Sequence, residues 1–267
     1  MARPRAGVGR FAFNLTVGLI YLFLMLPIII VVIASLNSGA YLKFPPDGLS
    51  LRWYKEFFTN GPFLNSAWLS IKVAVISTII STIIGTLAAL YYVKASERMQ
   101  IGLRLGLISP ILLPEILTAI ALLLFYYMVG IGTTTLIGLQ IGHVLITTPY
   151  VFLNVTATLE GINPSLQEAA RSLGARPQMA FRRVTLPLMK QGVVNGAMFA
   201  FIISFDTFSI SLLLKGIHSM TLPIQLFEYL RWSFDPTAAA VATLSILVTL
   251  AAVFITDRLV GLRTLRF

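Results

Sequence analysis

Long apolar runs with few charged residues constrain this chain more than any other feature. Of its 267 residues, 57% are hydrophobic and only 11% are charged, whereas about a quarter of the residues in a soluble domain are charged. About 20 apolar residues are enough for a helix to cross the hydrocarbon core of a bilayer. Backbone N–H and C=O groups in that core need partners within the protein, and a helix supplies them. The sequence therefore predicts an all-α, polytopic membrane protein.

Six such runs are separated by polar or turn-rich stretches. We predict six transmembrane helices at about residues 13–36, 64–93, 103–129, 135–158, 192–214 and 236–255. The first run is too long for the apolar core of a cleaved signal peptide, which has about 7–15 residues. Asp235 followed by Pro236 is expected to cap the last helix. Because no repeat or low-complexity tract divides the chain, we expect residues 1–267 to form a single transmembrane domain.

Positive charge is distributed unevenly along the chain. The net charge of +10 could suggest a nucleic-acid partner, but the Lys and Arg residues cluster beside the apolar runs. With six spans, fourteen of them fall on the side of the two termini and five on the other side. Such an excess marks the cytoplasmic side of a membrane protein. We therefore expect no nucleic-acid partner, and both termini on the cytoplasmic side of the membrane.

Residues 159–190 form a long polar stretch between the fourth and fifth runs, here called the polar hairpin. A helix is expected to begin in it, either through the capping-box spacing of Ser165 and Glu168 or through Asn163 followed by a proline. Gly174 permits the left-handed conformation that ends a helix. The hairpin is therefore predicted to be a cytosolic helix–turn–helix that projects from the membrane domain, with small residues that let a partner approach closely.

The same hairpin resembles a known signature. Glu168-Ala169-Ala170, then Gly174, Val184 and Leu186-Pro187 are similar to the EAA motif of membrane subunits of bacterial ABC importers, in which Ile is usual at the position of Val184. The resemblance implies a coupling helix that binds an ATPase. The residues expected to make that contact are Glu168, Ala169, Ala170, Leu173, Gly174, Leu186 and Pro187.

The resemblance extends along nearly the whole chain. The stretches similar to the second permease of spermidine/putrescine importers are residues 21–37, residues 44–54, Leu113-Pro114-Glu115, Ser204-Phe205-Asp206 and residues 221–236. This implies a type I ABC importer transmembrane domain that pairs with a second permease, two cytosolic ATPase subunits and an extracytoplasmic solute-binding protein. Relatives with this pattern also handle other amines, opine-type compounds and organophosphonates, so the solute stays open.

Motifs for catalysis or cofactor binding are absent from the sequence. It contains no G-x-x-x-x-G-K-[ST], no H-E-x-x-H, no G-x-S-x-G and no cysteine, so we expect neither an enzyme nor a metal site. His143 is expected to be a satisfied polar residue within a span, and His218 a solvated loop residue. ATP and Mg would bind to separate ATPase subunits.

Two carboxylates, Glu115 and Asp206, fall within the predicted spans. A charge at the bilayer centre costs roughly 2.5–3.5 kcal/mol on insertion scales. Our hypothesis is that both line a translocation path and favour a cationic solute. The alternatives are pairing with Lys72 or with backbone donors, or neutralisation by protonation. A different class of protein, an ion-coupled secondary transporter, could use the same two residues as proton or sodium sites.

Aromatic residues near these carboxylates could line the same passage, since aromatic faces attract ammonium groups. The candidates are Tyr126, Tyr127, Phe205 and Phe208. Packing or lipid contact is the alternative for each of them. Pro110 and Pro114 are expected to loosen the helix before Glu115. Trp53 and Tyr54, in a short helix predicted over residues 51–58, suit the headgroup layer of the membrane.

Overall fold

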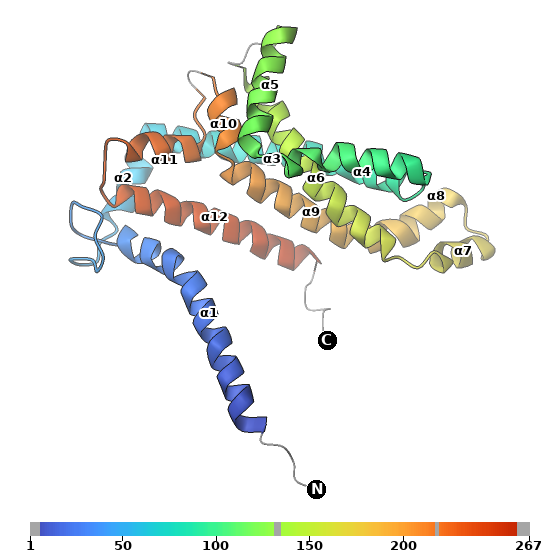
Figure 1. Ribbon diagram of the computed structural model, residues 1–267, viewed down its shortest axis with the longest axis horizontal. Helices are drawn as coiled ribbons and strands as arrows, with labels where there is room; N and C mark the ends of the chain where they lie inside the picture. Colours follow the sequence, from blue (N-terminus) through green and yellow to red (C-terminus); the bar gives the residue numbers. More distant parts are fainter. Residues whose placement is uncertain (1–5, 131–134, 217–218, 261–267) are drawn as a thin grey trace. The chain divides into compact units, whose positions relative to one another are not determined.

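The computed structural model describes residues 6–130, 135–216 and 219–260. Within these ranges the regular structure is helical, with an isolated bridge between Asn37 and Leu49 and no strand (Figure 1). The prediction of an all-α protein is confirmed. Five helices in the described residues are long and apolar enough to cross a membrane, or six if one bent pair counts as a span.

The longer helices are α1 (Ala6–Ser35), α3 (Gly61–Tyr92), α4 (Glu97–Leu112), α5 (Glu115–Val129), α6 (Leu136–Glu160), α9 (Leu186–Asp206) and α12 (Thr237–Val260). The shorter elements are α2 (Arg52–Thr59), α7 (Ser165–Ser172), α8 (Pro177–Ala180), the π-helical turn η1 (Phe181–Thr185), α10 (Ser209–Leu214) and α11 (Leu222–Leu230).

The third predicted span, at residues 103–129, is two helices rather than one. α4 and α5 are bent by 105° at a break, and Figure 1 shows α5 standing steeply away from α4. Leu113 and Pro114 are both extended there, with ψ of 144° and 129°. Proline disfavours the helical conformation of the residue before it and has no N–H for the helix ladder. The sequence predicted a loosened helix, whereas the chain turns a corner.

The fifth predicted span, at residues 192–214, also differs from the structure. The helix begins earlier, because α8, η1 and α9 form one apolar helical run from Pro177 to Asp206. It also ends earlier, because Thr207 is extended, and α10 starts again at Ser209. Two of the predicted spans are therefore interrupted within the described chain.

The chain groups into two compact units, residues 1–61 with 228–247 and residues 62–227 with 248–267, whereas the sequence predicts a single domain. In the first unit the loop after α1 is held by Asn37, whose side-chain oxygen accepts from the N–H groups of Gly39 and Asp47. Trp53 donates to the carbonyl of Asn37 at 2.6 Å. Trp53 is buried, so in this structure its ring belongs to the unit's core rather than to its surface.

The start of α12 is also fixed within the first unit. Asp235 accepts from the N–H of Thr237 at 2.9 Å, as expected of a cap. Its other oxygen accepts from the hydroxyl of Tyr229 at 2.5 Å. Burial raises the pKa of Tyr229, and the hydrogen bond to Asp235 raises this pKa further. The two segments of the unit meet where the N–H of Leu42 donates to the carbonyl of Phe234.

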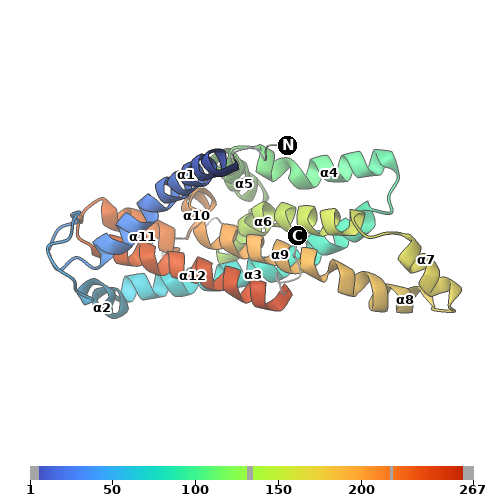
Figure 2. The same cartoon turned by 90° about the horizontal axis from the view of Figure 1, so that it is seen from below.

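In the second unit α6 packs between α3 and α9. α6 and α9 lie side by side in both views (Figures 1 and 2). A Cβ on Gly85 of α3 or on Gly196 of α9 would lie 2.8 Å from atoms of Val151 on α6. Glycine at these two positions therefore lets the helix backbones approach closely.

Two apolar clusters pack within this unit. One contains Val73, Ala119, Tyr126, Leu139, Ile146, Ile210 and Leu214, and the other Ala89, Tyr92, Val151, Phe152, Val155, Met189 and Ala200. Polar pairs cross between the same helices. The hydroxyls of Ser81 and Thr147 are 2.7 Å apart, and the amide of Gln140 contacts the hydroxyl of Ser77. The unit is thus joined by apolar packing and by buried hydrogen bonds.

Candidate functional site

α7 in the polar hairpin has well-defined ends. The side chain of Asn163 accepts from the N–H of Ser165 at 3.0 Å, so the cap is Asn163 followed by Pro164, one of the two alternatives that the sequence left open. At the other end the N–H of Gly174 donates to Arg171, and the N–H of Ala175 donates to Ala170. These two bonds form a Schellman motif. Local sequence therefore sets the length of this short helix.

Glycine is needed at position 174 because of its backbone conformation and not because a neighbouring atom is too close for a side chain. Its φ is +84°, and a Cβ there would meet nothing within 4 Å. Residues with a side chain pay roughly 1–2 kcal/mol for this left-handed conformation. The glycine thus fixes the direction in which the chain leaves α7.

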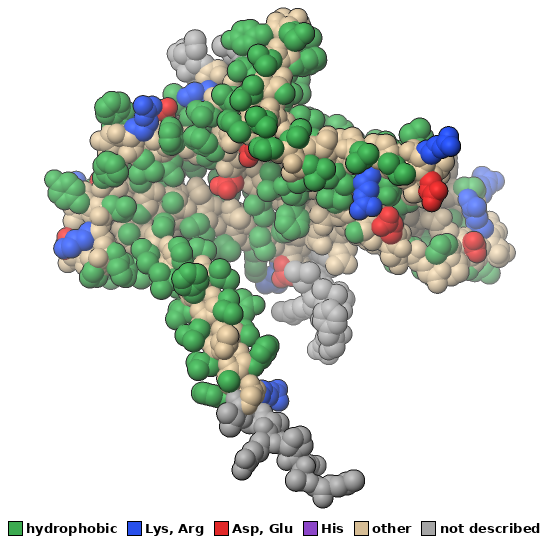
Figure 3. All heavy atoms as spheres, in the orientation of Figure 1, with side chains coloured by type: hydrophobic (Ala, Val, Ile, Leu, Met, Phe, Trp, Pro, Cys, Tyr) green, Lys and Arg blue, Asp and Glu red, His purple; other side chains and the backbone are tan. Residues whose placement is uncertain are grey.

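Most of the α7 surface is exposed. Leu173 is 89% exposed and Leu166 is 47% exposed, and both Glu168 and Ala169 are also exposed. The amide of Gln167 contacts the hydroxyl of Thr185 in η1, which holds one side of α7 to the next part of the hairpin. Figures 1 and 2 place α7 and α8 together at one end of the second unit. Figure 3 shows charged side chains gathered over this end.

The second half of the hairpin leads directly into α9. The N–H of Leu186 donates to the carbonyl of Phe181, five residues earlier. Pro187 follows, and it lacks the N–H that would continue the ordinary ladder. A π-turn is a usual way for a helix to absorb such an interruption. Leu186 and Pro187 are both exposed, so the hairpin leads into α9, whose first residues are accessible.

Glu115 joins the two helix breaks. It is the first residue of α5, and its carboxylate accepts from the hydroxyl of Thr207 and, at 3.3 Å, from the N–H of Ile210. Thr207 lies in the α9–α10 break, and Ile210 lies in the first turn of α10. We call Glu115, Thr207 and Ile210 the break junction. The backbone contact with Ile210 matches the alternative of backbone donors rather than that of a pair with Lys72, and the hydroxyl of Thr207 is a donor that the sequence did not predict.

Asp206 differs from Glu115. It is the last residue of α9 and is exposed, and its carboxylate has no hydrogen bond or ion pair among the described residues. The sequence treated these two carboxylates alike. The structure gives Glu115 partners within the chain and leaves Asp206 accessible.

The aromatic candidates lie mostly inside the second unit. Tyr126 is 1% exposed and donates to the carbonyl of Gly138 at 2.9 Å. Phe205 is buried and stacks on Phe201. Phe208 is half-buried and meets Phe227 edge to face at 5.1 Å. In this conformation these rings act in packing, and Tyr127 of the same group is 70% exposed.

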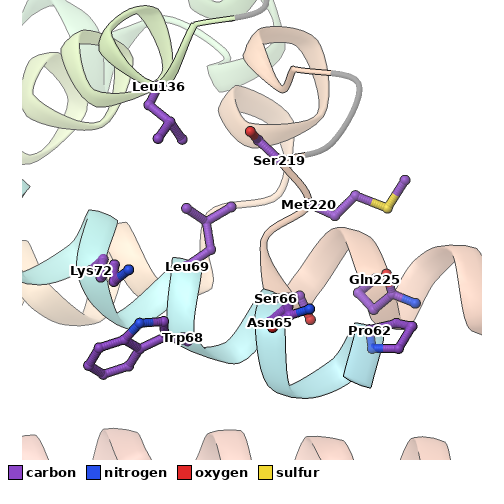
Figure 4. Close-up of a pocket in the computed structure, with 10 residues that line it drawn as sticks. All are labelled: Pro62, Asn65, Ser66, Trp68, Leu69, Lys72, Leu136, Ser219, Met220 and Gln225. Carbon is purple, nitrogen blue, oxygen red and sulfur yellow. The ribbon is translucent and has the colours of Figure 1, made fainter. Parts of the chain in front are cut away.

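Lys72 lies in a pocket of about 510 Å³ (Figure 4). Its ammonium is 5.1 Å from the centre of the Trp68 ring. The lining residues are Pro62, Asn65, Ser66, Trp68, Leu69, Lys72, Leu136, Ser219, Met220 and Gln225. In Figure 4, Leu69 and Leu136 lie between the Lys72 end and the Gln225 end. No described carboxylate lines this pocket, and Lys72 brings a positive charge to it.

His143 links α6 to α9 and α10 through hydrogen bonds. The sequence predicted a satisfied polar residue here but not its partners. His143 is 1% exposed, and its ring nitrogens lie 2.8 Å and 3.0 Å from the hydroxyls of Ser204 and Ser211. Gln140, His143 and Thr147 recur every three or four residues in α6, so they share one face. That spacing is the signal that could have located the polar contacts among α3, α6, α9 and α10. His218 lies outside the described residues.

The described residues contain no group of three or more His, Cys, Asp or Glu that could hold a metal ion. The features that stand out are therefore an exposed helical hairpin, a helix that runs from it into the unit, and a pair of joined helix breaks.

Comparison with known proteins identifies the family. Residues 81–265 match the binding-protein-dependent transport system inner membrane component family. The chain belongs to this family. It is therefore a multi-pass membrane subunit of a transporter rather than a catalyst, as the sequence predicted.

Curated relatives cover most of the chain. It is 30% identical over 238 residues to the spermidine/putrescine transport system permease protein PotC of Haemophilus influenzae, covering 89% of this chain and 92% of PotC. It is 30% identical over 230 residues to the putrescine transport system permease protein PotI of Escherichia coli K12, covering 84% and 82%. The molybdenum transport system permease protein ModB of Mycobacterium bovis is also 30% identical, over 210 residues covering 73% and 78%.

Solved structures share the fold. A chain of a bacterial ABC transporter for the acidic polysaccharide alginate has a TM-score of 0.71 at 18% identity, covering 97% of this chain and 99% of that one. A chain of the MetNI methionine ABC transporter, in inward-facing conformations, has a TM-score of 0.65 at 19% identity, covering 74% and 94%. At these identities the likeness establishes the architecture and not the solute.

Proposed function

We propose that this chain is one of two paired permeases of an ATP-driven importer for polyamines or a related small amine. The observation that carries the proposal is the 30% identity, over most of the chain, to permeases named for spermidine and putrescine transport. An extracytoplasmic solute-binding protein would deliver the solute. Two ATPase subunits in the cytoplasm would bind ATP and Mg, and the solute would pass between the two permeases.

The polar hairpin is the proposed docking point for an ATPase subunit. Leu166 and Leu173 expose apolar side chains on the short helix α7, and a short helix of this kind binds by lying in an apolar groove of its partner. Glu168, Ala169 and Ala170 belong to the same surface. The excess of Lys and Arg on this side of the chain supports a cytoplasmic position for the hairpin and for both termini.

Movement of the docked hairpin has a direct route into the membrane domain. α9 continues from the hairpin for 21 residues, about 30 Å at the usual rise, and ends at Asp206 beside the break junction. The proposed mechanism is alternating access, in which ATP shifts the transporter between two arrangements of its spans. ATP can do this only if it binds the two states with different affinity.

Selection of an amine within the permease would involve Asp206 more directly than Glu115. Asp206 has an accessible carboxylate, whereas Glu115 already accepts two hydrogen bonds. The family also includes permeases for other solutes, and the ModB relative is named for molybdenum. Opines and organophosphonates therefore remain alternative solutes for the same architecture.

Reconstitution with the neighbouring gene products tests this function. The chain would be purified with its paired permease, ATPase and solute-binding protein, placed in proteoliposomes and supplied with labelled spermidine or putrescine. ATP-dependent uptake supports the proposal. If molybdate, an opine or an organophosphonate competes and a polyamine does not, the proposed solute is wrong but the ATP-driven mechanism still holds. Gradient-driven uptake by the purified chain without an ATPase would overturn the ABC mechanism.

A further inference from the structure

A second pocket, of about 460 Å³, lies between the turn after α3 and the start of the α8–η1 helix. Its lining residues are Lys94, Pro177, Gln178, Phe181 and Arg182. The turn and the helix are more than 80 residues apart in the sequence, so the pocket is a tertiary feature. It brings two cationic side chains to one opening.

The charges of this pocket are uncompensated. Neither Lys94 nor Arg182 makes a side-chain hydrogen bond or an ion pair with another described residue, and no carboxylate lines the opening. A guanidinium binds phosphate through two parallel N–H···O bonds, and an ammonium adds a point charge. The amide of Gln178 is a further donor. This donor set fits a phosphate group.

We propose that the pocket binds the phosphate of an anionic phospholipid headgroup in the cytoplasmic leaflet. Lys94 follows the end of α3, a helix long and apolar enough to span a membrane, by two residues, and basic residues that flank the cytoplasmic end of a span lie near the headgroups. Phe181, which is half-buried, and Pro177 offer an apolar floor for the glycerol and the first acyl carbons. Basic pockets at the cytoplasmic ends of transmembrane helices bind anionic headgroups in this way.

The site has a consequence for transport. A bound headgroup would connect the α3–α4 turn to the second half of the polar hairpin. The hairpin would then be held in part by lipid, and its movement would depend on the anionic lipid content of the membrane. This step rests on the proposed function, because it assumes that the hairpin faces the cytoplasm and drives the spans.

Arg183 supplies a matched control. It follows Arg182 in η1 and is exposed, but it does not line the pocket. Consecutive residues of a helical turn do not share a face, so the two arginines face different surroundings. Arg182→Gln and Arg183→Gln remove the same charge at the same membrane surface. Non-specific attraction to anionic lipid predicts equal effects of the two changes, whereas a site predicts unequal effects.

The experiment measures lipid binding to the full chain without any ATPase or solute. The chain and its variants, purified in neutral detergent, are titrated with phosphatidylglycerol, with phosphatidylcholine and with inorganic phosphate, and native mass spectrometry gives the bound fraction. We expect Arg182→Gln and Lys94→Gln to weaken phosphatidylglycerol binding about tenfold or more, as for a lost charge-assisted hydrogen bond. Arg183→Gln should weaken it at least about fivefold less than Arg182→Gln. Arg182→Lys should recover part of the affinity.

The outcomes separate the sources of the phosphate. Phosphatidylglycerol binding that is sensitive to Arg182 and is not displaced by inorganic phosphate supports the proposal. Equal effects of the two arginine changes, or equal binding of phosphatidylcholine, would overturn it. So would tight binding of inorganic phosphate alone, or unchanged phosphatidylglycerol binding in Arg182→Gln. None of these measurements depends on transport. A failed uptake assay therefore contradicts the proposed function, whereas a failed lipid assay contradicts only the lipid site.

Discussion

Two regions of the second unit use the same residue type for opposite purposes. Glu168 and Glu115 both lie in the first turn of a helix. Glu168, in the polar hairpin, is exposed beside exposed leucines, whereas Glu115, in the break junction, accepts from a hydroxyl and a backbone N–H of another helix pair. An exposed apolar surface on a well-capped helix suits a partner outside the chain. A half-buried carboxylate with two hydrogen-bond donors marks a joint within the chain.

The largest effect is expected from a charge on the exposed side of α7. Ala169→Asp would bury an unpaired carboxylate in the ATPase groove, at a cost of several kcal/mol. We expect ATPase affinity to fall about a hundredfold and uptake to be lost, with normal membrane insertion. Co-purification and uptake assays measure both. Ala169→Ser, neutral and nearly as small, is the control, and wild-type coupling in Ala169→Asp would show that this surface is not the docking site.

A backbone change in the same hairpin should act without touching the interface. Gly174→Val puts a β-branched residue at a φ of +84°, which costs more than the roughly 1–2 kcal/mol of an ordinary residue. We expect uptake to fall about tenfold, while ATP hydrolysis continues without transport. Gly102→Val is the control. A Cβ at Gly102 also meets nothing within 4 Å, but the φ of Gly102 is not in the left-handed region. Equal effects of the two valines would contradict a conformational role for Gly174.

The break junction should respond in stability rather than in coupling. Glu115→Gln removes the charge from two hydrogen bonds, each worth about 1.5–3 kcal/mol when charged. We expect a lower unfolding temperature in detergent, with ATPase binding unchanged.

A double-mutant cycle with Thr207→Val isolates the Glu115–Thr207 contact, because valine keeps the shape of threonine and lacks its hydroxyl. The two changes should be non-additive, as for residues in direct contact. Additive losses of stability would mean that Glu115 and Thr207 do not act as one joint. If Glu115→Gln keeps wild-type stability but loses uptake, Glu115 belongs to the translocation path instead.

The smallest effect is expected at Asp206, the accessible carboxylate. Asp206→Asn keeps the size of the side chain and removes its charge, and an exposed ion pair is worth about 0.2–1 kcal/mol. We expect the KM for a polyamine to rise about two- to fivefold, with unchanged thermal stability. A loss of stability like that of Glu115→Gln would erase the contrast between the two carboxylates. Unchanged uptake would show that Asp206 is not part of the translocation path.

Some features of the candidate site were predictable because their causes are local. The cap at Asn163, one of two alternatives, and the left-handed Gly174 each depend on residues within about six positions along the chain. Pro114 was expected to loosen its helix, but the sequence did not predict the 105° corner there. The expected function of Tyr126 and Phe205 as passage-lining rings was not predictable in this way. Whether an aromatic ring lines a passage or fills a core depends on which helix packs against it, and the structure buries both rings.

The sequence alone determined that this protein is a helical membrane protein with a polar hairpin, because apolar length and local capping chemistry act over short distances. Only the tertiary structure decided that Glu115 joins two helix breaks across 92 residues, that Lys72 lies over Trp68, and that Lys94 and Arg182 share one pocket. These pairings depend on helix packing in three dimensions. Residue spacing cannot specify them, since many pairings of helix faces are compatible with the same apolar pattern.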